Sequence, residues 1–477
     1  MSDKFNSYRY KTQPYEHQKK VLKDSWAELY YAYLLEMGTG KSKCAIDNIG
    51  MLYEDNKINA VLIIAPKGVM DNWSKGEIPV HLPDRIPRIV CGWTPSSSKK
   101  FAEELKHITY HKTNDLKFFV MNVEAFSTSR GTKAAYEFLL KNPENMVVVD
   151  ESTTIKNRKA ARTKNIMELR NVSLYRRILT GSPVTKSPMD LFSQCFFLSP
   201  RALGFNSYYA FQNRYAQVQS RTMGNRSFQE IVGYRRLDEL NEKLLSFSNR
   251  TLKEDCLDLP EKIYTRRHIE LTDEQLTVYT QMKKLALAQL QNGDLATTES
   301  VLTQIMRLQQ ICCGFFQPDE GAIQPLANNR LSGLMSVIDE CSGKAIIWAS
   351  YTYDIQRIAQ ALRDRFGPDS VATYFGGTPQ NDRQDIVNKF QDADSDLRFF
   401  VGQPKTGGFG ITLTQARTVI YFSNSYDLEI RLQSEDRAHR ISQKKSVTYV
   451  DLVSPNTIDE KVLSALRKKI GLAGQVL

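Results

Sequence analysis

The stretch of residues 31–48 constrains the fold of this chain more than any other, because an apolar segment passes through a glycine-bearing turn into a helical pattern. Residues 31–35 are apolar, and the spacing after Ser42 is that of a helix rather than a strand. Gly38 and Gly40 let the N–H groups of the turn point inward, where with the helix N-terminus they form a site for a phosphate chain. The pattern predicts a strand, a phosphate-binding loop and a helix.

Two side chains of this loop have candidate roles in holding a nucleotide. Lys41 would reach the terminal phosphates, and the Ser42 hydroxyl would bind Mg²⁺. Leu35 stands where the motif G-x-x-x-x-G-K-[ST] has its first glycine, so a plain glycine turn before a capped surface helix is the open alternative. The candidate nucleotide-binding residues of the loop are Met37, Gly38, Thr39, Gly40, Lys41 and Ser42.

A glutamine upstream of the loop is a candidate for adenine recognition. Gln18 closes the sequence Gln-Pro-Tyr-Glu-His-Gln at residues 13–18. A carboxamide can pair with both a donor and an acceptor on the adenine edge, which would select ATP. A glutamine that caps a helix or faces solvent is the alternative that stays open at this point.

Short continuous apolar runs at residues 60–65, 118–121 and 146–149 predict parallel strands that are buried on both faces. The third run delivers Asp150 and Glu151 to its carboxyl end. Sites in open α/β sheets form outside the carboxyl ends of the strands, so we expect Asp150 in the Mg²⁺ shell and Glu151 to orient and deprotonate a water. Acidic turn residues are the alternative. The N-terminal region is therefore predicted to form a doubly wound sheet with ATP at its edge.

The pattern changes in the middle of the chain and then returns. Strand-like runs are rare in residues 198–329, which we interpret as a helical insertion or bridge with a polar loop at 217–226. Alternating strands and helices after it predict a second α/β domain without a phosphate loop. The middle helices are expected at 271–291 and 301–313, the later strands at 344–349, 397–401 and 418–422, and the later helices at 354–366 and 380–390.

The second domain carries a candidate pair of phosphate-binding arginines. Gln433, Arg437 and Arg440 are spaced i, i+4 and i+7, so on one helix they would share a face. Two adjacent guanidinium groups can stabilise the charge on a phosphoryl group during transfer. A surface helix with stray arginines is the alternative.

The net charge of +11 is unevenly distributed over the 477 residues. Residues 151–187 contain nine lysines and arginines against two acids. Such a cluster is often only a solvated face, but beside a nucleotide site it indicates a polyanionic partner. The seven cysteines form no C-x-x-C pair, which argues against a disulfide framework or a zinc site.

Targeting signals are not evident in the sequence. Residues 1–11 are polar, and no run of about 18 apolar residues exists. We therefore expect a protein that is neither exported nor membrane-spanning, with free thiols in a reducing cytoplasm.

Several motifs together resemble one known family. Residues 433–443, Gln-Ser-Glu-Asp-Arg-Ala-His-Arg-Ile-Ser-Gln, are close to the last motif of the Swi/Snf-like DNA-dependent ATPases, a branch of the superfamily-two helicases and translocases. Residues 376–379 (Gly-Gly-Thr-Pro) and 180–183 (Thr-Gly-Ser-Pro) resemble two further motifs. The resemblance runs from about residue 13 to residue 461. It implies two RecA-like lobes of doubly wound parallel sheet, with a helical bridge between them.

The resemblance also implies domain boundaries and site residues. The expected domains are an ATP-binding lobe at 1–197, the helical insertion and bridge at 198–329, a second lobe at 330–455 and a brace helix at 456–477. The expected ATP site contains Gln18, Lys41, Ser42, Asp150 and Glu151 from the first lobe, and Gly408, Gln433, Arg437 and Arg440 from the second. The expected DNA contacts are Lys67, Lys156, Arg158, Lys405 and Thr412.

The sequence departs from the family pattern at three places. Ser152 and Thr153 stand where relatives usually carry glycine or alanine and then histidine. Gln403 and Pro404 replace a pair of small hydroxyl residues, and Thr412 stands where asparagine is common. The first departure lies beside the hydrolytic carboxylates, so it concerns how hydrolysis couples to DNA rather than hydrolysis itself.

We expect an ATP- and Mg²⁺-dependent enzyme that moves along double-stranded DNA, with forks, junctions or protein–DNA complexes as candidate targets. One alternative is a strand-separating DNA or RNA helicase, because the core motor is shared. Another is a DNA-binding scaffold that uses ATP as a conformational switch. The expected partner is double-stranded or branched DNA, the expected state a monomer, and the expected location the cytoplasm of a bacterium or phage-infected host.

Overall fold

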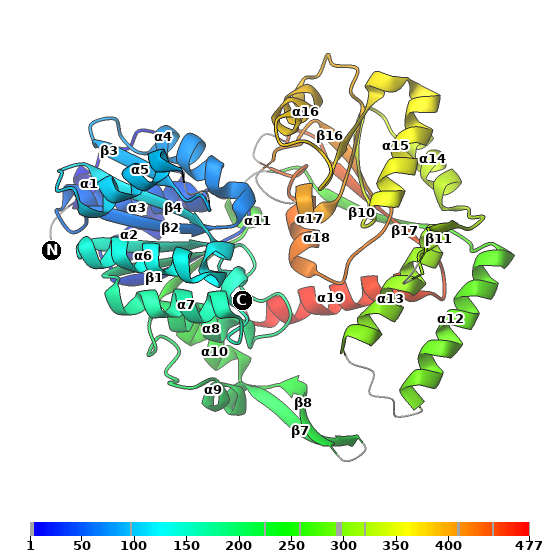
Figure 1. The fold of residues 1–477 in the computed structure, drawn as a ribbon, viewed down its shortest axis with the longest axis horizontal. Coiled ribbons are helices and arrows are strands. Elements are labelled where there is room, and N and C mark those ends of the chain that lie inside the picture. The colour runs from blue at the N-terminus through cyan, green and yellow to red at the C-terminus, as the bar shows by residue number, and fades with distance from the viewer. Residues whose placement is uncertain are drawn as a thin grey trace. The chain divides into compact units, whose positions relative to one another are not determined.

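The computed structural model of this chain describes residues 4–95, 98–223, 226–256, 259–291, 298–318, 321–407, 411–440 and 443–476. The chain divides into two compact units, each with its own parallel sheet (Figure 1). Unit 1 comprises residues 1–221, 227–257 and 471–477, and unit 2 comprises residues 222–226 and 258–470.

The sheet of unit 1 is parallel wherever strand pairing is described. Its strand order is β3 (Arg88–Gly92), β4 (Leu116–Asn122), β2 (Ala60–Ala65), β5 (Asn145–Asp150), β6 (Tyr175–Leu179), β1 (Tyr30–Leu35) and β9 (Ser248–Thr251). Because the strands run the same way, their carboxyl ends meet at one edge. The ends of β1 and β5 are separated there only by β6.

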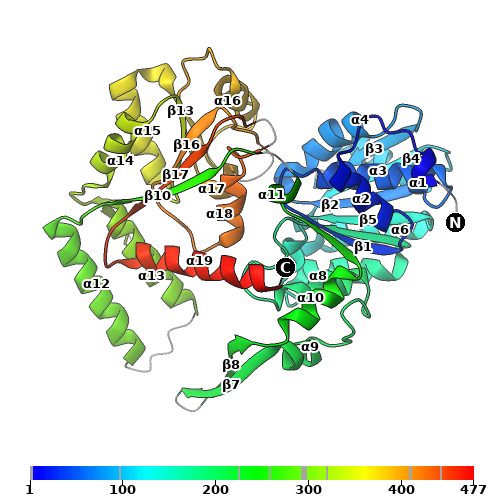
Figure 2. The ribbon, with the colours of Figure 1, turned by 180° about the vertical axis from the view of Figure 1, so that it is seen from behind.

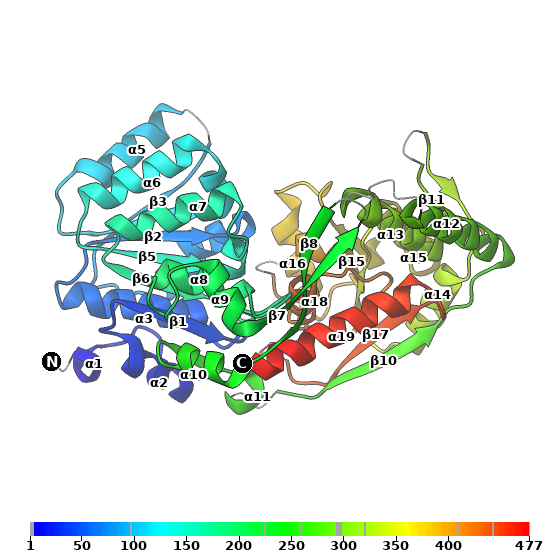
Figure 3. The ribbon, with the colours of Figure 1, turned by 90° about the horizontal axis from the view of Figure 1, so that it is seen from below.

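Alternate residues of each strand feed two different cores. Leu34 packs into a core with helices α5 to α8, whereas Leu35 packs into a core with α2 and α3. Figure 3 shows α5 to α8 along one face of the sheet and α3 along the other. Both faces are thus covered, which explains the continuous apolar runs. The helices are α1 (Lys4–Ser7), α2 (Glu16–Ser25), α3 (Lys41–Glu54), α4 (Ile78–His81), α5 (Lys99–Tyr110), α6 (Ser129–Lys141), α7 (Ala161–Glu168) and α8 (Asp190–Leu198).

The segment after α8 forms a hairpin that was not expected. After α9 (Tyr208–Tyr215), β7 (Ala216–Met223) pairs with β8 (Arg226–Tyr234), and α10 (Leu237–Leu245) follows (Figure 2). The predicted polar loop at 217–226 is therefore wrong. Val218 and Ile231 lie against the core of unit 1. Residues 217–222 are Gln-Val-Gln-Ser-Arg-Thr, and one apolar residue among six does not indicate a strand.

The sheet of unit 2 is also parallel wherever strand pairing is described. Its order is β10 (Lys262–His268), β17 (Val447–Val453), β16 (Ala416–Tyr421), β13 (Lys344–Trp348), β15 (Phe399–Gly402) and β14 (Val371–Tyr374). Helices α14 (Arg330–Glu340) and α15 (Thr352–Phe366) share a core with one face, and α16 (Asp382–Gln391) shares a core with the other.

A further core of unit 2 joins α12 (Asp273–Gln291), α13 (Thr298–Cys313), α18 (Leu428–Glu435) and α19 (Ile458–Val476). The two middle helices lie close to their predicted ranges, but the interval 198–329 is not purely helical. It contributes the edge strand β9 to one sheet and the edge strand β10 to the other. The remaining short elements are α11 (Lys253–Cys256), β11 (Phe315–Phe316), β12 (Gln324–Pro325) and α17 (Pro404–Gly407).

Across the described residues, none of the helices combines the length and the apolar character needed to span a bilayer. The same residues contain no cluster of three histidine, cysteine or acidic side chains arranged to hold a metal ion. The seven cysteines are free thiols.

Candidate nucleotide site and nucleic-acid contacts

The predicted phosphate loop connects β1 to α3 and has the backbone that its glycines permit. Gly38 has φ 84° and Gly40 has φ 90°, both in the left-handed region. A Cβ atom on Gly40 would lie 2.2 Å from Nε2 of Gln18, so a side chain has no room there. The Thr39 hydroxyl donates to the Glu36 carbonyl at 2.7 Å and closes the turn. Ser42 occupies the second position of α3.

Gln18 lies against this loop and is only 2% exposed. Its Nε2 donates to the Thr39 carbonyl at 3.0 Å, and its Oε1 accepts from the backbone N–H of Tyr15 at 3.0 Å. The capping alternative is therefore real, and the residue also supports the loop. Each amide atom can make a second hydrogen bond, so these contacts are compatible with the predicted adenine recognition.

Two aromatic rings beside Gln18 had no role in the sequence argument. Tyr15 and His17 stack with centroids 5.8 Å apart and ring planes 8° from parallel, and Tyr15 is 50% exposed. Nε2 of His17 lies 2.9 Å from the Thr39 carbonyl oxygen. An exposed ring next to a nucleotide loop is a stacking surface for a base.

The structure brings Lys41 and Asp150 together at the carboxyl edge of the sheet. Lys41 is 9% exposed and donates to the Leu35 carbonyl at 3.0 Å. Asp150 ends β5, where burial raises the pKa of its carboxyl, while the hydrogen bond from Trp73 and the charge of Lys41 lower it. Nε1 of Trp73 donates to Oδ2 of Asp150 at 2.8 Å. The two predicted groups therefore interact electrostatically.

Glu151 is held in an unusual backbone conformation. Its φ of 47° and ψ of 62° lie in the left-handed region, which costs a residue with a side chain about 1–3 kcal/mol. Its N–H donates to Oδ1 of Asp150 at 3.0 Å, and its carbonyl accepts from Thr154 at 2.9 Å. Such conformations persist only where surrounding contacts fix them, and they concentrate at functional sites.

The Thr-Gly-Ser-Pro loop after β6 packs on the phosphate loop. A Cβ atom on Gly181 would lie 3.1 Å from the backbone nitrogen of Met37. Arg250 of β9 donates to the Gly181 carbonyl at 3.1 Å. The buried side chain of Gln194 contacts Ser152 and Pro183. Sequence reasoning missed Trp73, Arg250 and Gln194 as site residues.

The predicted DNA contacts of unit 1 differ in their surroundings. Lys67 is exposed just after β2, whereas Lys156 is half-buried and donates to the Thr185 hydroxyl at 2.7 Å. The Arg158 guanidinium carbon lies 4.2 Å from the ring centroid of Tyr208 and 5.2 Å from that of Tyr209. Arg158 is thus fixed by cation–π contacts, and Tyr209 is 65% exposed.

The basic cluster at 151–187 exposes less positive charge than its composition indicates. Arg177 is fully buried and donates to the Asn48 side chain at 3.0 Å. Arg176 donates to the Leu198 carbonyl at 2.7 Å, and Arg170 to the Phe196 carbonyl at 3.1 Å. These three arginines hold the fold, so they add little to any polyanion-binding surface.

In unit 2 the predicted helical face of Gln433, Arg437 and Arg440 is wrong. Helix α18 ends at Glu435, so both arginines follow it in a turn. The Glu435 carbonyl accepts from the Tyr449 hydroxyl at 2.9 Å, and the Arg437 carbonyl accepts from the Leu413 N–H at 2.9 Å. Carbonyls bonded to other segments do not continue the helical ladder.

The two arginines have different surroundings. Arg437 is fully buried, and its guanidinium donates to the Gln433 carbonyl at 2.9 Å and to the Ile411 carbonyl at 3.0 Å. It braces the turn in this conformation, which does not support the predicted phosphate contact. Arg440 is partly exposed, and it donates to the Thr412 hydroxyl at 2.9 Å.

Arg440, predicted to contact the nucleotide, and Thr412, predicted to contact DNA, therefore bond to each other in unit 2. Of the other predictions there, Gln433 is buried and donates to Glu429 at 3.3 Å, and Lys405 is exposed on α17. Gly408 lies outside the described residues.

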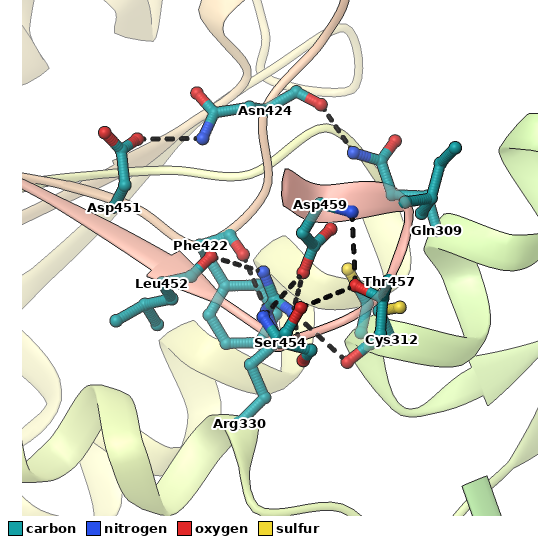
Figure 4. A network of polar contacts seen from close by, with 12 residues as sticks. Gln309, Cys312, Arg330, Phe422, Asn424, Asp451, Leu452, Ser454, Thr457 and Asp459 are labelled. Atoms are coloured by element: carbon teal, nitrogen blue, oxygen red, sulfur yellow. Dashed lines mark hydrogen bonds and ion pairs between the residues drawn. The ribbon is translucent and has the colours of Figure 1, made fainter. Parts of the chain in front are cut away.

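A buried polar network fixes the segment that leads into α18 (Figure 4). Arg330 of α14 donates to the carbonyl of Phe422, just after β16, and to that of Leu452, near the end of β17. It also donates to Asp459 of α19, and all three bonds measure 2.7–2.8 Å. Asn424 donates to Asp451 at 2.8 Å, as the figure shows. These contacts tie the carboxyl ends of β16 and β17 to each other and to α14 and α19.

The chain is similar in sequence to known families and proteins. The chain matches the SNF2-related domain over residues 34–316 and the helicase conserved C-terminal domain over residues 329–442. It is 26% identical over 471 residues to the SWI/SNF chromatin-remodeling complex subunit snf22 of Schizosaccharomyces pombe, covering 93% of this chain and 26% of that protein. It is 26% identical over 448 residues to the uncharacterized ATP-dependent helicase MG018 of Mycoplasma genitalium, covering 93% and 40%.

A solved structure, the Sulfolobus solfataricus SWI2/SNF2 ATPase core in complex with dsDNA, aligns with a TM-score of 0.43 and 23% identity, covering 98% of this chain and 94% of that one. The chain spans between a quarter and two fifths of the length of the two curated relatives described above. The match to the SNF2-related domain covers more than half of the chain. The chain therefore belongs to the SNF2-related family of helicase-class ATPases.

Proposed function

We propose that this protein is an ATP-dependent translocase on double-stranded DNA, in which ATP hydrolysis drives movement along the duplex. The observation that carries the proposal is the carboxyl edge of the unit 1 sheet. There a phosphate loop with two left-handed glycines lies beside the interacting pair Lys41 and Asp150, and the strained Glu151 follows directly. Phosphate-binding and hydrolytic groups thus meet at one edge.

ATP would bind to this edge through its phosphates and its base. The loop N–H groups and the start of α3 offer donors to the phosphates, and Lys41 supplies a positive charge. Gln18 contacts the loop at Thr39, and Tyr15 stacks on His17 beside it, so an adenine could pair and stack there.

The residues at the site fit Mg²⁺. Ser42 and Asp150 provide a hydroxyl and a carboxylate, which are ligands of the kind that this cation takes with nucleotide phosphates. Each carboxylate oxygen of Asp150 accepts one hydrogen bond and has a further lone pair to give. The ion, when bound, would neutralise charge on the phosphates.

Hydrolysis would begin with Glu151, which orients a water and accepts its proton. Arg440 of unit 2 would stabilise the charge that develops on the transferred phosphoryl group. Arg437 would hold the turn on which Arg440 is carried.

The proposed DNA contacts are Lys67, Lys156, Arg158, Lys405 and Thr412. They are mostly cationic side chains that reach phosphates rather than base edges, so binding would be independent of sequence and would weaken steeply with salt. One relative is a subunit of a chromatin-remodeling complex, which supports duplex DNA as the substrate.

The test is steady-state ATP turnover with and without duplex DNA. We expect DNA to stimulate turnover in the wild type, and Lys41→Ala and Glu151→Gln to abolish it. Lys106→Ala and Glu103→Gln are matched controls, because both side chains are exposed on α5 away from the carboxyl edge. Turnover that persists in both site variants would show that the hydrolytic site is elsewhere.

A second candidate function is strand separation, which the β7–β8 hairpin favours. A two-stranded ribbon is narrow enough to enter a nucleic-acid groove or the junction between two strands. Release of a labelled strand from a forked substrate would support this function. Turnover on the fork without strand release would favour translocation alone.

A further inference from the structure

A buried glutamine connects the turn that carries Glu151 to the loop after β6. The hydroxyl of Ser152 donates to Oε1 of Gln194 at 2.6 Å. Nε2 of Gln194 donates to the carbonyls of Pro183 and Asp190, each at 2.8 Å. Gln194 and Ser152 are both 0% exposed, so water does not compete for these contacts.

The carboxamide of Gln194 can take only one orientation. Its nitrogen faces two backbone carbonyls, which accept hydrogen bonds and cannot donate them. A flipped amide would place its oxygen against both carbonyls. The Ser152 hydroxyl is therefore the donor to Oε1. Gln194 makes three directed bonds, one to Ser152, one to the loop after β6 and one within its own helix α8.

One end of this connection reaches the hydrolytic residue. Ser152 directly follows Glu151, whose left-handed backbone requires support from its neighbours. The bond between Ser152 and Gln194 anchors the residue after the strained position. A shift of Gln194 would therefore be felt at the backbone that aims the Glu151 carboxylate.

The other end reaches a residue that we propose to contact DNA. Asp190 lies one turn before Gln194 on α8, and its Oδ2 accepts from the Thr185 N–H at 3.0 Å and from the Thr185 hydroxyl at 3.1 Å. Lys156 donates to the same hydroxyl at 2.7 Å. A DNA phosphate that draws the Lys156 ammonium away would break its bond to Thr185. Thr185 lies in the loop after β6, which Asp190 of α8 holds.

We infer that Gln194 is a positioning residue that transmits DNA contact at Lys156 to the orientation of Glu151. The inference rests on the proposed function, because it presupposes DNA-stimulated hydrolysis. It also gives the departure at Ser152 a role: the hydroxyl at this position is the donor that attaches the hydrolytic turn to α8.

The test compares the DNA-stimulation factor, which is kcat with saturating duplex DNA divided by kcat without it. Gln194→Met removes the directed bonds at similar volume, and Ser152→Ala removes only the hydroxyl. Each should lower the factor roughly fivefold or more, the size that one hydrogen bond corresponds to, while KM for ATP stays the same. Ser248→Ala is the matched control, because its buried hydroxyl donates to the Leu244 carbonyl at 2.7 Å away from this edge.

A double-variant cycle checks that Ser152 and Gln194 act through one contact. Once either partner is changed, the second substitution should alter the stimulation factor little further, because the bond is already lost. If the decrease in the logarithm of the stimulation factor in the double variant equals the sum of the decreases in the two single variants, the inference is contradicted. An unchanged factor in Ser152→Ala would overturn it even if Gln194→Met fails to fold.

The inference and the proposed function fail in different ways. If wild-type turnover does not respond to duplex DNA, the proposed function is wrong. If DNA stimulates the wild type, but both variants lose turnover equally with and without DNA, then Gln194 is only structural. A factor that falls in Ser248→Ala to the same extent would also assign the effect to general destabilisation.

Discussion

Replacing Trp73 with phenylalanine removes the hydrogen bond that the indole N–H donates to Asp150 at 2.8 Å while leaving an aromatic ring in its place. Trp73 is 1% exposed, so water cannot substitute for the lost donor without rearrangement. A hydrogen bond to a charged acceptor contributes about 1.5–3 kcal/mol. The substitution therefore isolates the contribution of one donor to the ionised state of Asp150.

The sign of the effect follows from which form the donor stabilises. The indole N–H favours the carboxylate and lowers the pKa of Asp150, against the burial that raises it. Its loss should therefore raise the pKa of Asp150 further, because the ionised form loses a donor that contributes about 1.5–3 kcal/mol. The acidic limb of kcat/KM against pH, which reports the group of the free enzyme that must be deprotonated, should move to higher pH in the variant.

The matched control is Trp93→Phe, because Trp93 is 8% exposed in the core of the same unit and packs against Phe101 and Phe119. It loses comparable ring area without removing a donor from Asp150. An acidic limb that stays in place in Trp73→Phe, or that moves equally in both variants, would refute the assignment of Asp150 and Trp73.

Three further predictions concern unit 2. Arg440→Ala should retain ATP binding but lose turnover by ~10³ or more, as other arginine fingers do, and single-turnover kinetics would show this split. Arg437→Leu should instead lower the free energy of unfolding by about 3 kcal/mol, because it leaves the Ile411 and Gln433 carbonyls unpaired. Denaturant unfolding measures the loss, and an unchanged midpoint would contradict the bracing role of Arg437. Burial raises the pKa of Asp354 from 3.8 to about 6, so the folded state holds this proton more tightly than the unfolded state does. The free energy of unfolding should therefore fall as pH rises from about 4 to about 6. Asp354→Asn should flatten this dependence of stability on pH.

The parts of the fold that the sequence predicts well are those that local pattern determines. The apolar run at 60–65 coincides with β2, because a strand covered on both faces must be apolar throughout. The helix expected at 354–366 is α15 from residue 352 to 366, where apolar residues recur at helical spacing.

Two of the missed strands, β9 and β10, are set by tertiary pairing instead. Strand β9 is Ser-Asn-Arg-Thr, and β10 is largely exposed, so neither has the apolar pattern of a buried strand. Each lies at the edge of its sheet and forms because β1 or β17 offers a free row of backbone groups. Edge strands of this kind carry polar side chains for the same reason.

The site residues divide in the same way, into those that a local motif predicts and those that tertiary structure brings to the site. Lys41 and Asp150 follow from motif spacing, because each directly follows a predicted strand or loop. Trp73 and Gln194 reach the site over sequence separations of 77 and 42 residues, which no local pattern encodes. The burial of Arg437 was missed because periodicity does not show where a helix ends once its carbonyls bond to other segments.

Displacement of the third strand from a triplex on plain duplex DNA tests the central claim most directly, since it reports movement along a duplex without separation of its strands. We predict ATP-dependent displacement by the wild type, none by Lys41→Ala, and an intact underlying duplex. A triplex that stays in place while duplex DNA stimulates ATP turnover would contradict translocation as the function of this chain.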